Sequence, residues 1–176
     1  MLGYRLTICL LAGSLVAPAA SAQRAGSIEA GALVRGTLFD PSLQVQTALG
    51  AGGRAAAYLA PFLFVEVDFS STTVNGLASF PRASYQPLHA RLNFLTPYSD
   101  RGKAIVGLGV VTTHYGGDFD KSDKGIASLF GLRIDLHRSL VGRLDVTFDY
   151  VPSPANGAGN NWIGGMHLGI GYAFRQ

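Results

Sequence analysis

The chain has 176 residues, with 14 Lys and Arg, 11 Asp and Glu, a formal net charge of +3 and a single Cys. Its length suggests one domain, and so small a net charge gives no reason to expect a nucleic-acid partner. Charged residues make up only 14% of the chain, against roughly 25% in an ordinary soluble domain. Beyond the N-terminus no run of about 20 apolar residues occurs, which excludes a membrane protein built from helices.

The N-terminal segment has the pattern of a secretory signal peptide. A positive charge precedes an apolar core over Leu6–Val16, and residues 20–22 (Ala-Ser-Ala) form a small-residue cleavage motif. We therefore expect residues 1–22 to be removed during export by the Sec route, leaving one mature domain over residues 23–176. The single Cys, Cys9, lies in the removed part, so no disulfide framework is expected.

Residues 27–39 begin a series of segments in which apolar and polar residues alternate. Successive side chains of a β-strand point to opposite faces, so this alternation indicates strands with two different faces. The next segment, 45–59, is weaker because it is rich in Gly and Ala. Residues 63–72 alternate most clearly, with four large apolar residues opposite two acids, and 87–95 repeats the pattern.

The second half of the chain continues the series. Residues 103–115 are apolar on both faces, whereas 125–136 and 140–150 alternate apolar residues with Arg and Asp. The last segment, 161–174, alternates large apolar residues mainly with Gly. The mostly longer connections are residues 40–44, 73–86, 116–124 and 151–160. An even number of strands with alternating short and long connections predicts an all-β fold, an eight-stranded antiparallel up-and-down transmembrane β-barrel.

The charges on the predicted strands indicate which face lies inside. A soluble exterior normally carries many lysines, but the three here, Lys103, Lys121 and Lys124, lie at strand ends or in a loop. The strand charges are Arg, Asp and Glu in near balance among small residues, as a narrow packed lumen requires. We therefore predict an apolar face towards lipid and a polar lumen. The predicted lumen network consists of Glu29, Arg35, Arg54, Glu66, Asp68, His89, Arg91, Arg133, Asp135, Arg143, Asp145, Asp149 and His167.

Aromatic residues gather near the ends of the predicted strands, where membrane barrels carry aromatic girdles. The predicted lipid-facing girdle consists of Phe69, Phe94, Tyr150, Trp162, Tyr172 and Phe174. Position near a strand end assigns Phe39, Tyr58, Phe62, Tyr98 and Tyr115 to the same girdles. The alternative is that these rings pack in the core of a soluble sandwich.

Two stretches resemble the small OmpA-type outer-membrane β-barrel family. They are residues 52–61 (Gly-Gly-Arg-Ala-Ala-Ala-Tyr-Leu-Ala-Pro), which run into 65–68 (Val-Glu-Val-Asp), and the closing strand 168–174 (Leu-Gly-Ile-Gly-Tyr-Ala-Phe). The resemblance implies location in the cell outer membrane of a Gram-negative envelope, contact with outer-membrane lipid and lipopolysaccharide, and a closing strand whose Phe174 is recognised by the barrel-assembly machinery. The peptidoglycan-binding domain of some members is not expected here.

Three patterns could carry chemistry. His137-x-Ser139 resembles the His-x-Ser of outer-membrane lipid A deacylases, which use Ser, His and an acid, but the downstream Asn-rich signature is missing. Residues 118–123 (Asp-Phe-Asp-Lys-Ser-Asp) resemble the start of a calcium loop but lack its later Gly and Glu. His89 and His167 share the predicted lumen without an evident third metal ligand. We therefore expect no catalytic residues, no metal and no cofactor.

The sequence thus predicts an integral outer-membrane barrel with a structural or surface-interaction role, whose longer connections would bind any surface ligand. Three alternatives remain. A narrow pore would conduct ions and respond to changes in lumen charge, and a soluble periplasmic lipid-binding barrel would have its apolar face inside. A lipid A-modifying enzyme would depend on Ser139.

Overall fold

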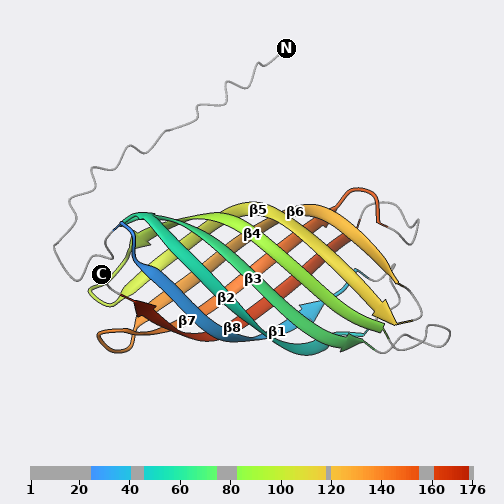
Figure 1. Cartoon of the computed structure of the whole chain (residues 1–176), viewed down its shortest axis with the longest axis horizontal. Helices are drawn as coiled ribbons and strands as arrows, with labels where there is room; N and C mark the ends of the chain where they lie inside the picture. The colour runs from blue at the N-terminus through green and yellow to red at the C-terminus, as the bar shows by residue number, and fades with distance from the viewer. Residues whose placement is uncertain (1–24, 41–45, 75–82, 118–119, 155–160, 175–176) are drawn as a thin grey trace, which may run out of the picture.

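The computed structural model describes residues 25–40, 46–74, 83–117, 120–154 and 161–174. The strands in these residues are β1 (Ile28–Leu38), β2 (Ala48–Ala60), β3 (Leu63–Val74), β4 (Ala83–Pro97), β5 (Gly102–Gly117), β6 (Lys121–Asp135), β7 (Leu140–Val151) and β8 (Asn161–Phe174). Each strand pairs antiparallel with its neighbour in sequence, and β8 pairs with β1, which closes the sheet into a barrel (Figure 1). Within this described part, no helix is long and apolar enough to cross a membrane.

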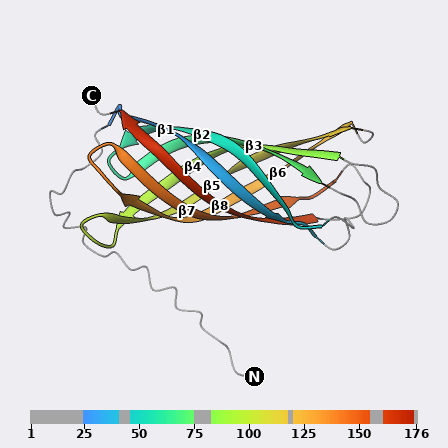
Figure 2. The same ribbon diagram turned by 90° about the horizontal axis from the view of Figure 1, so that it is seen from below.

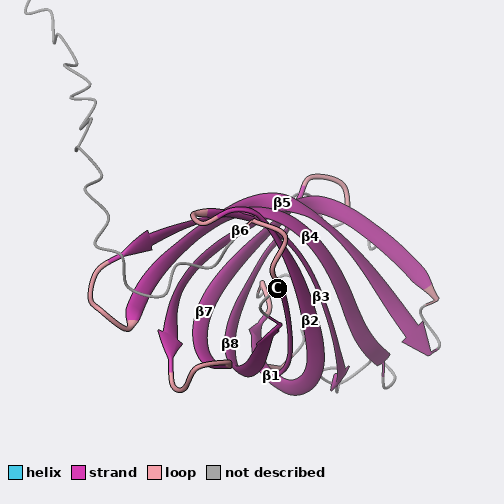
Figure 3. Cartoon of the chain, turned by 60° about the vertical axis from the view of Figure 1, so that its left-hand side comes forward, coloured by secondary structure: helices cyan, strands magenta, loops and turns pink. Residues whose placement is uncertain are grey.

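The predicted eight-stranded antiparallel barrel is therefore confirmed, and Figure 3 shows how the strands curve around a common interior. The largest differences from the sequence prediction are that β4 begins at Ala83 and β6 at Lys121, each four residues earlier than expected. Pro87 lies within β4, where the β3–β4 pairing is interrupted between Leu88 and Tyr85. A residue without an N–H can be accommodated at such a gap. The predicted signal peptide lies outside the described residues.

The two ends of the barrel differ. The connections 61–62, 98–101 and 136–139 lie at the end that also holds the C-terminal end of β8 (Figures 1 and 2). We call this the turn end. The other four connections leave the opposite end, which we call the loop end. Three of them are longer, but the predicted long connection 116–124 is reduced to residues 118–120, because β5 and β6 extend further than expected. Most residues of these four connections lie outside the described part of the chain.

Side chains alternate strictly between the interior and the exterior of the barrel. On β3, Glu66 and Asp68 are 1% and 2% exposed, whereas Val65 and Val67 are 39% and 45% exposed. The other strands repeat this pattern, so that large apolar side chains cover the outside and charged ones lie inside. This arrangement is the predicted one for a membrane barrel and is the inverse of a water-soluble barrel.

Glycine on the interior face allows strands and side chains to approach closely. A Cβ atom on Gly52 would lie 2.7 Å from the Cα of Ser70 on the neighbouring strand. A Cβ atom on Gly165 would lie 3.0 Å from Nη2 of Arg35. Gly52 therefore permits a close strand contact, and Gly165 leaves space for a large interior side chain, as expected where a strand has glycine at alternate positions.

Candidate functional site

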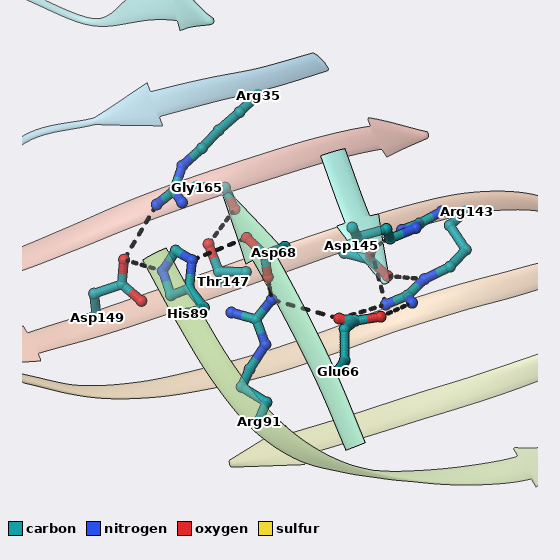
Figure 4. Close-up of polar contacts among 11 residues, drawn as sticks. Arg35, Glu66, Asp68, His89, Arg91, Arg143, Asp145, Thr147, Asp149 and Gly165 are labelled. Carbon is teal, nitrogen blue, oxygen red and sulfur yellow. Dashed lines mark hydrogen bonds and ion pairs between the residues drawn. The ribbon is translucent and has the colours of Figure 1, made fainter. Parts of the chain in front are cut away.

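Glu66 lies at the centre of the charged network that fills the middle of the barrel (Figure 4). Its carboxylate forms ion pairs with Arg143, whose Nη2 is 3.4 Å from Oε1, and with Arg91, whose Nη2 is 3.5 Å from the same oxygen. Arg91 also pairs with Asp68, and Arg143 Nη2 lies 3.1 Å from Asp145. All five residues are at most 3% exposed. Three strands, β3, β4 and β7, are thus connected through buried ion pairs.

His89 extends this network towards the loop end of the barrel. Its Nδ1 lies 2.9 Å from Oδ1 of Asp68, and its Nε2 lies 3.1 Å from Oδ2 of Asp149. Arg35 Nη2 lies 3.1 Å from the same Asp149 oxygen. His89 therefore bridges the carboxylates of Asp68 and Asp149 through its two ring nitrogens.

A second group of ion pairs lies near the turn end. Arg133 Nε is 3.1 Å from Oε2 of Glu29 and also pairs with Asp135. Lys103 Nζ lies 3.4 Å from Asp135, and the Tyr58 hydroxyl donates to Glu29 at 3.4 Å. These pairs connect β1, β2, β5 and β6. Desolvated charges of this kind are tolerated only when they are paired.

Two apolar clusters fill the interior around the charged groups. The first consists of Ala56, Tyr58, Phe64, Leu95, Ile105 and Leu129. The second consists of Val74, Tyr85 and Ile163, with Phe39, Ala48 and Tyr115 packed against it. The guanidinium carbon of Arg143 lies 5.9 Å from the centre of the Phe64 ring, and that of Arg35 lies 5.8 Å from the centre of the Tyr85 ring. Each cluster therefore packs against an arginine of the network, at a distance that allows cation–π attraction.

The structure places every residue of the predicted lumen network inside the barrel. Twelve of the thirteen are buried, and Asp135 is half-buried. His167 is buried too, but it lies outside the ion-pair chain, and its Nε2 has no hydrogen-bond partner among the described residues. Sequence reasoning missed Lys103 as a lumen residue: it lies near a strand end, but it alternates in phase with buried Ile105.

The predicted girdle residues all lie on the outside, at different heights. Tyr150 is half-buried and its ring centre lies 4.7 Å from that of Trp162. Phe69 is 44% exposed, but it is the seventh residue of the 12-residue β3 and so lies in the middle of the strand. The other four residues of the predicted girdle are exposed and lie near strand ends: Phe94, Trp162, Tyr172 and Phe174.

Three of the additional aromatic assignments are wrong. Tyr58 is 2% exposed and stacks on Phe64 with ring centres 4.8 Å apart. Phe39 and Tyr115 pack against the interior ring of Tyr85, at 5.0 Å and 5.7 Å between ring centres. Position near a strand end does not determine the side of the sheet, whereas alternation along the strand does.

The other motifs do not form a reactive site. The backbone N–H of His137 donates to the Leu140 carbonyl, and the Ser139 carbonyl accepts from Ala173, so both residues belong to a turn, and no acid pairs with the His137 ring among the described residues. In the calcium-like pattern, Asp120 is exposed whereas Asp123 is buried, so these acids do not converge. Asp118 lies outside the described residues. No group of three His, Cys, Asp or Glu side chains in the described ranges could hold a metal.

Comparison with known proteins places the fold among outer-membrane barrels. No family model and no curated protein matches the chain. The outer-membrane protein OprG of Pseudomonas aeruginosa has a TM-score of 0.63 and 16% identity, covering 88% of this chain and 98% of that one. Neisserial surface protein A has a TM-score of 0.63 and 17% identity, covering 84% and 96%. The attachment invasion locus protein Ail of Yersinia pestis has a TM-score of 0.51 and 16% identity, covering 85% and 99%. At these identities the likeness shows the fold.

Proposed function

We propose that this chain is an integral protein of the cell outer membrane, exported with a cleaved signal peptide, with a structural or surface-interaction role and no catalytic activity. The observation that carries the proposal is the inverted polarity of the barrel, with an apolar exterior and an ion-paired interior. Closure of the sheet pairs the backbone donors and acceptors of each strand, which is a condition for spanning lipid. Contacts with outer-membrane lipid and the barrel-assembly machinery belong to the same proposal.

The strand lengths fit a membrane. The shortest strand, β1, has 11 residues. With about 3.3 Å per residue and a tilt near 40°, it spans roughly 28 Å, enough for an apolar band about 25 Å tall.

The filled interior argues against the alternative functions. A periplasmic lipid carrier needs an apolar cavity, but the interior carries buried ion pairs on several strands. A pore needs a continuous aqueous path, whereas two apolar clusters and the charged network fill the described lumen. An eight-stranded barrel has an interior just wide enough for side chains to fill. The interior therefore acts as a structural core.

A surface ligand would bind at the loop end. Two of the similar structures have names that refer to the cell surface or to attachment: one is called a surface protein, and the other an attachment invasion locus protein. By analogy, the loop end of this chain would face the outside of the cell and contact a surface ligand or lipopolysaccharide. This orientation of the barrel in the membrane, with the loop end outside, can be tested directly.

Single-cysteine labelling tests the orientation. The only native Cys is Cys9, in the expected signal peptide, so an introduced Cys would be unique in the mature chain. In intact cells, a membrane-impermeant maleimide is expected to label Lys121→Cys at the loop end. It is expected to label Arg138→Cys at the turn end only after the outer membrane is permeabilised. Labelling of Arg138→Cys alone in intact cells would show the reverse orientation, and equal labelling of both in a soluble fraction would contradict membrane insertion.

A further inference from the structure

Two neighbouring turns at the turn end carry exposed basic side chains. Arg101 lies in the β4–β5 turn, and His137 and Arg138 lie in the β6–β7 turn. The turns are in contact, because the backbone N–H of Asp135 donates to the carbonyl of Arg101 at 2.9 Å. Figure 2 shows both turns at the same end of the barrel. None of the three basic side chains has an ion-pair partner among the described residues.

Exposed apolar side chains lie directly beside these basic residues. Tyr98 begins the β4–β5 turn and is 57% exposed, and Leu136 begins the β6–β7 turn and is 52% exposed. Ile134, near the end of β6, is also exposed. The outer apolar surface thus continues to the turns that carry the arginines. In a membrane, this places Arg101 and Arg138 at the boundary between hydrocarbon and water.

The basic residues of this rim outnumber the exposed acids near them. Asp100 is the exposed acid beside Arg101, whereas Asp135 is already paired with Arg133 and Lys103. The loop end is different, because its two lysines are accompanied by three acids within the described residues. These loop-end residues are Lys121, Lys124, Asp40, Asp120 and Asp123. Among the described residues, exposed basic side chains therefore outnumber exposed acids at the turn end, whereas acids outnumber lysines at the loop end.

We propose that the turn end binds anionic phospholipid of the inner leaflet of the outer membrane, with Arg101 and Arg138 contacting the headgroup phosphate. The inference rests on the membrane orientation proposed above. Guanidinium groups match phosphate with paired hydrogen-bond donors. Basic residues beside a membrane attract anionic headgroups. The adjacent Tyr98 and Leu136 contact the acyl region of the same lipid.

Quenching of a single tryptophan by brominated lipid tests this proposal. The only native tryptophan, Trp162, lies near the loop end. The mature chain with Tyr98→Trp and Trp162→Phe therefore reports on lipid at the turn end. It is refolded into phosphatidylcholine vesicles with increasing fractions of brominated phosphatidylglycerol. We expect about a fivefold preference for phosphatidylglycerol over phosphatidylcholine at this position, equivalent to about 1 kcal/mol.

The arginines are then changed in the same reporter background. Arg101→Gln with Arg138→Gln is expected to abolish the preference, giving a ratio of about one. The matched control is Lys121→Gln with Lys124→Gln, which removes the same formal charge from the other end and is expected to leave the fivefold preference intact. Added salt should weaken the preference of the reporter protein, because exposed charges are screened.

The outcomes separate this inference from the proposed function. If brominated phosphatidylcholine quenches the reporter but phosphatidylglycerol is not preferred, the lipid site is wrong and the membrane barrel stands. The same conclusion follows if the preference persists without Arg101 and Arg138, or is lost equally in the lysine control. If neither brominated lipid quenches the reporter, the chain does not insert and both proposals fail.

Discussion

Glu66→Ala is expected to lower the free energy of unfolding of the barrel by about 3 kcal/mol. Removing one partner of a buried ion pair typically costs about 3–5 kcal/mol, because the other charge stays desolvated. Here Arg91 and Arg143 both lose Glu66, but each keeps a second partner, Asp68 and Asp145 respectively. The expected loss is therefore at the lower end of that range.

The measurement is urea unfolding of the protein refolded in detergent micelles, followed by the mobility shift between folded and unfolded bands. Glu66→Gln keeps the shape and an acceptor oxygen but removes the charge, so it should lie between Glu66→Ala and the unmodified protein. Val67→Ala, one residue along the strand, changes an exterior side chain and should have a much smaller effect. Unchanged unfolding of Glu66→Ala would contradict an interior stabilised by this network.

Gly52→Ala is expected to destabilise the barrel by about 1–3 kcal/mol, the usual cost of overpacking a well-packed site. The new Cβ would lie 2.7 Å from the Cα of Ser70, and closer still to the Phe69 carbonyl oxygen. Both contacts are with backbone of the paired strand β3, so no side-chain rotation can relieve them. Relief requires the β2–β3 ladder to move apart locally.

Gly36→Ala is the matched control for Gly52→Ala. The same substitution on β1 would place a Cβ 3.6 Å from a Leu49 side-chain carbon, which is an ordinary contact. Glycine within a strand costs roughly 0.5–1 kcal/mol relative to alanine, so Gly36→Ala should leave stability unchanged or raise it slightly. Equal effects of the two substitutions in the same unfolding assay would contradict the close strand packing at Gly52.

The architecture was predictable because the barrel imposes one period on nearly every strand. Alternation over residues 63–72 is sufficient to put Glu66 on the face opposite Val65 and Val67. In the structure Glu66 is buried inside the barrel, and the two valines are exposed outside. A one-residue slip would reverse every side chain, so consistent alternation in several segments determines inside and outside together. Whether the outside of the barrel faces lipid or water then depends on which face of the strands carries the charges.

The contacts between strands were not predictable in the same way. That Arg133 pairs with Glu29, 104 residues away, depends on strand stagger and rotamers, which a single sequence does not contain. Tyr58 and Lys103 both lie near strand ends, but alternation along the strand places both side chains inside the barrel. β4 begins four residues before Pro87, which lies where the β3–β4 ladder is interrupted.

The most direct test of the account is a heat-modifiability gel on the isolated outer-membrane fraction of cells that express the chain, comparing unboiled and boiled samples. A folded membrane barrel resists detergent at room temperature and unfolds on boiling. We expect a band in this fraction that shifts in mobility when the sample is boiled. Its absence there, with a soluble band in the periplasm, would contradict the outer-membrane barrel and restore the lipid-carrier alternative.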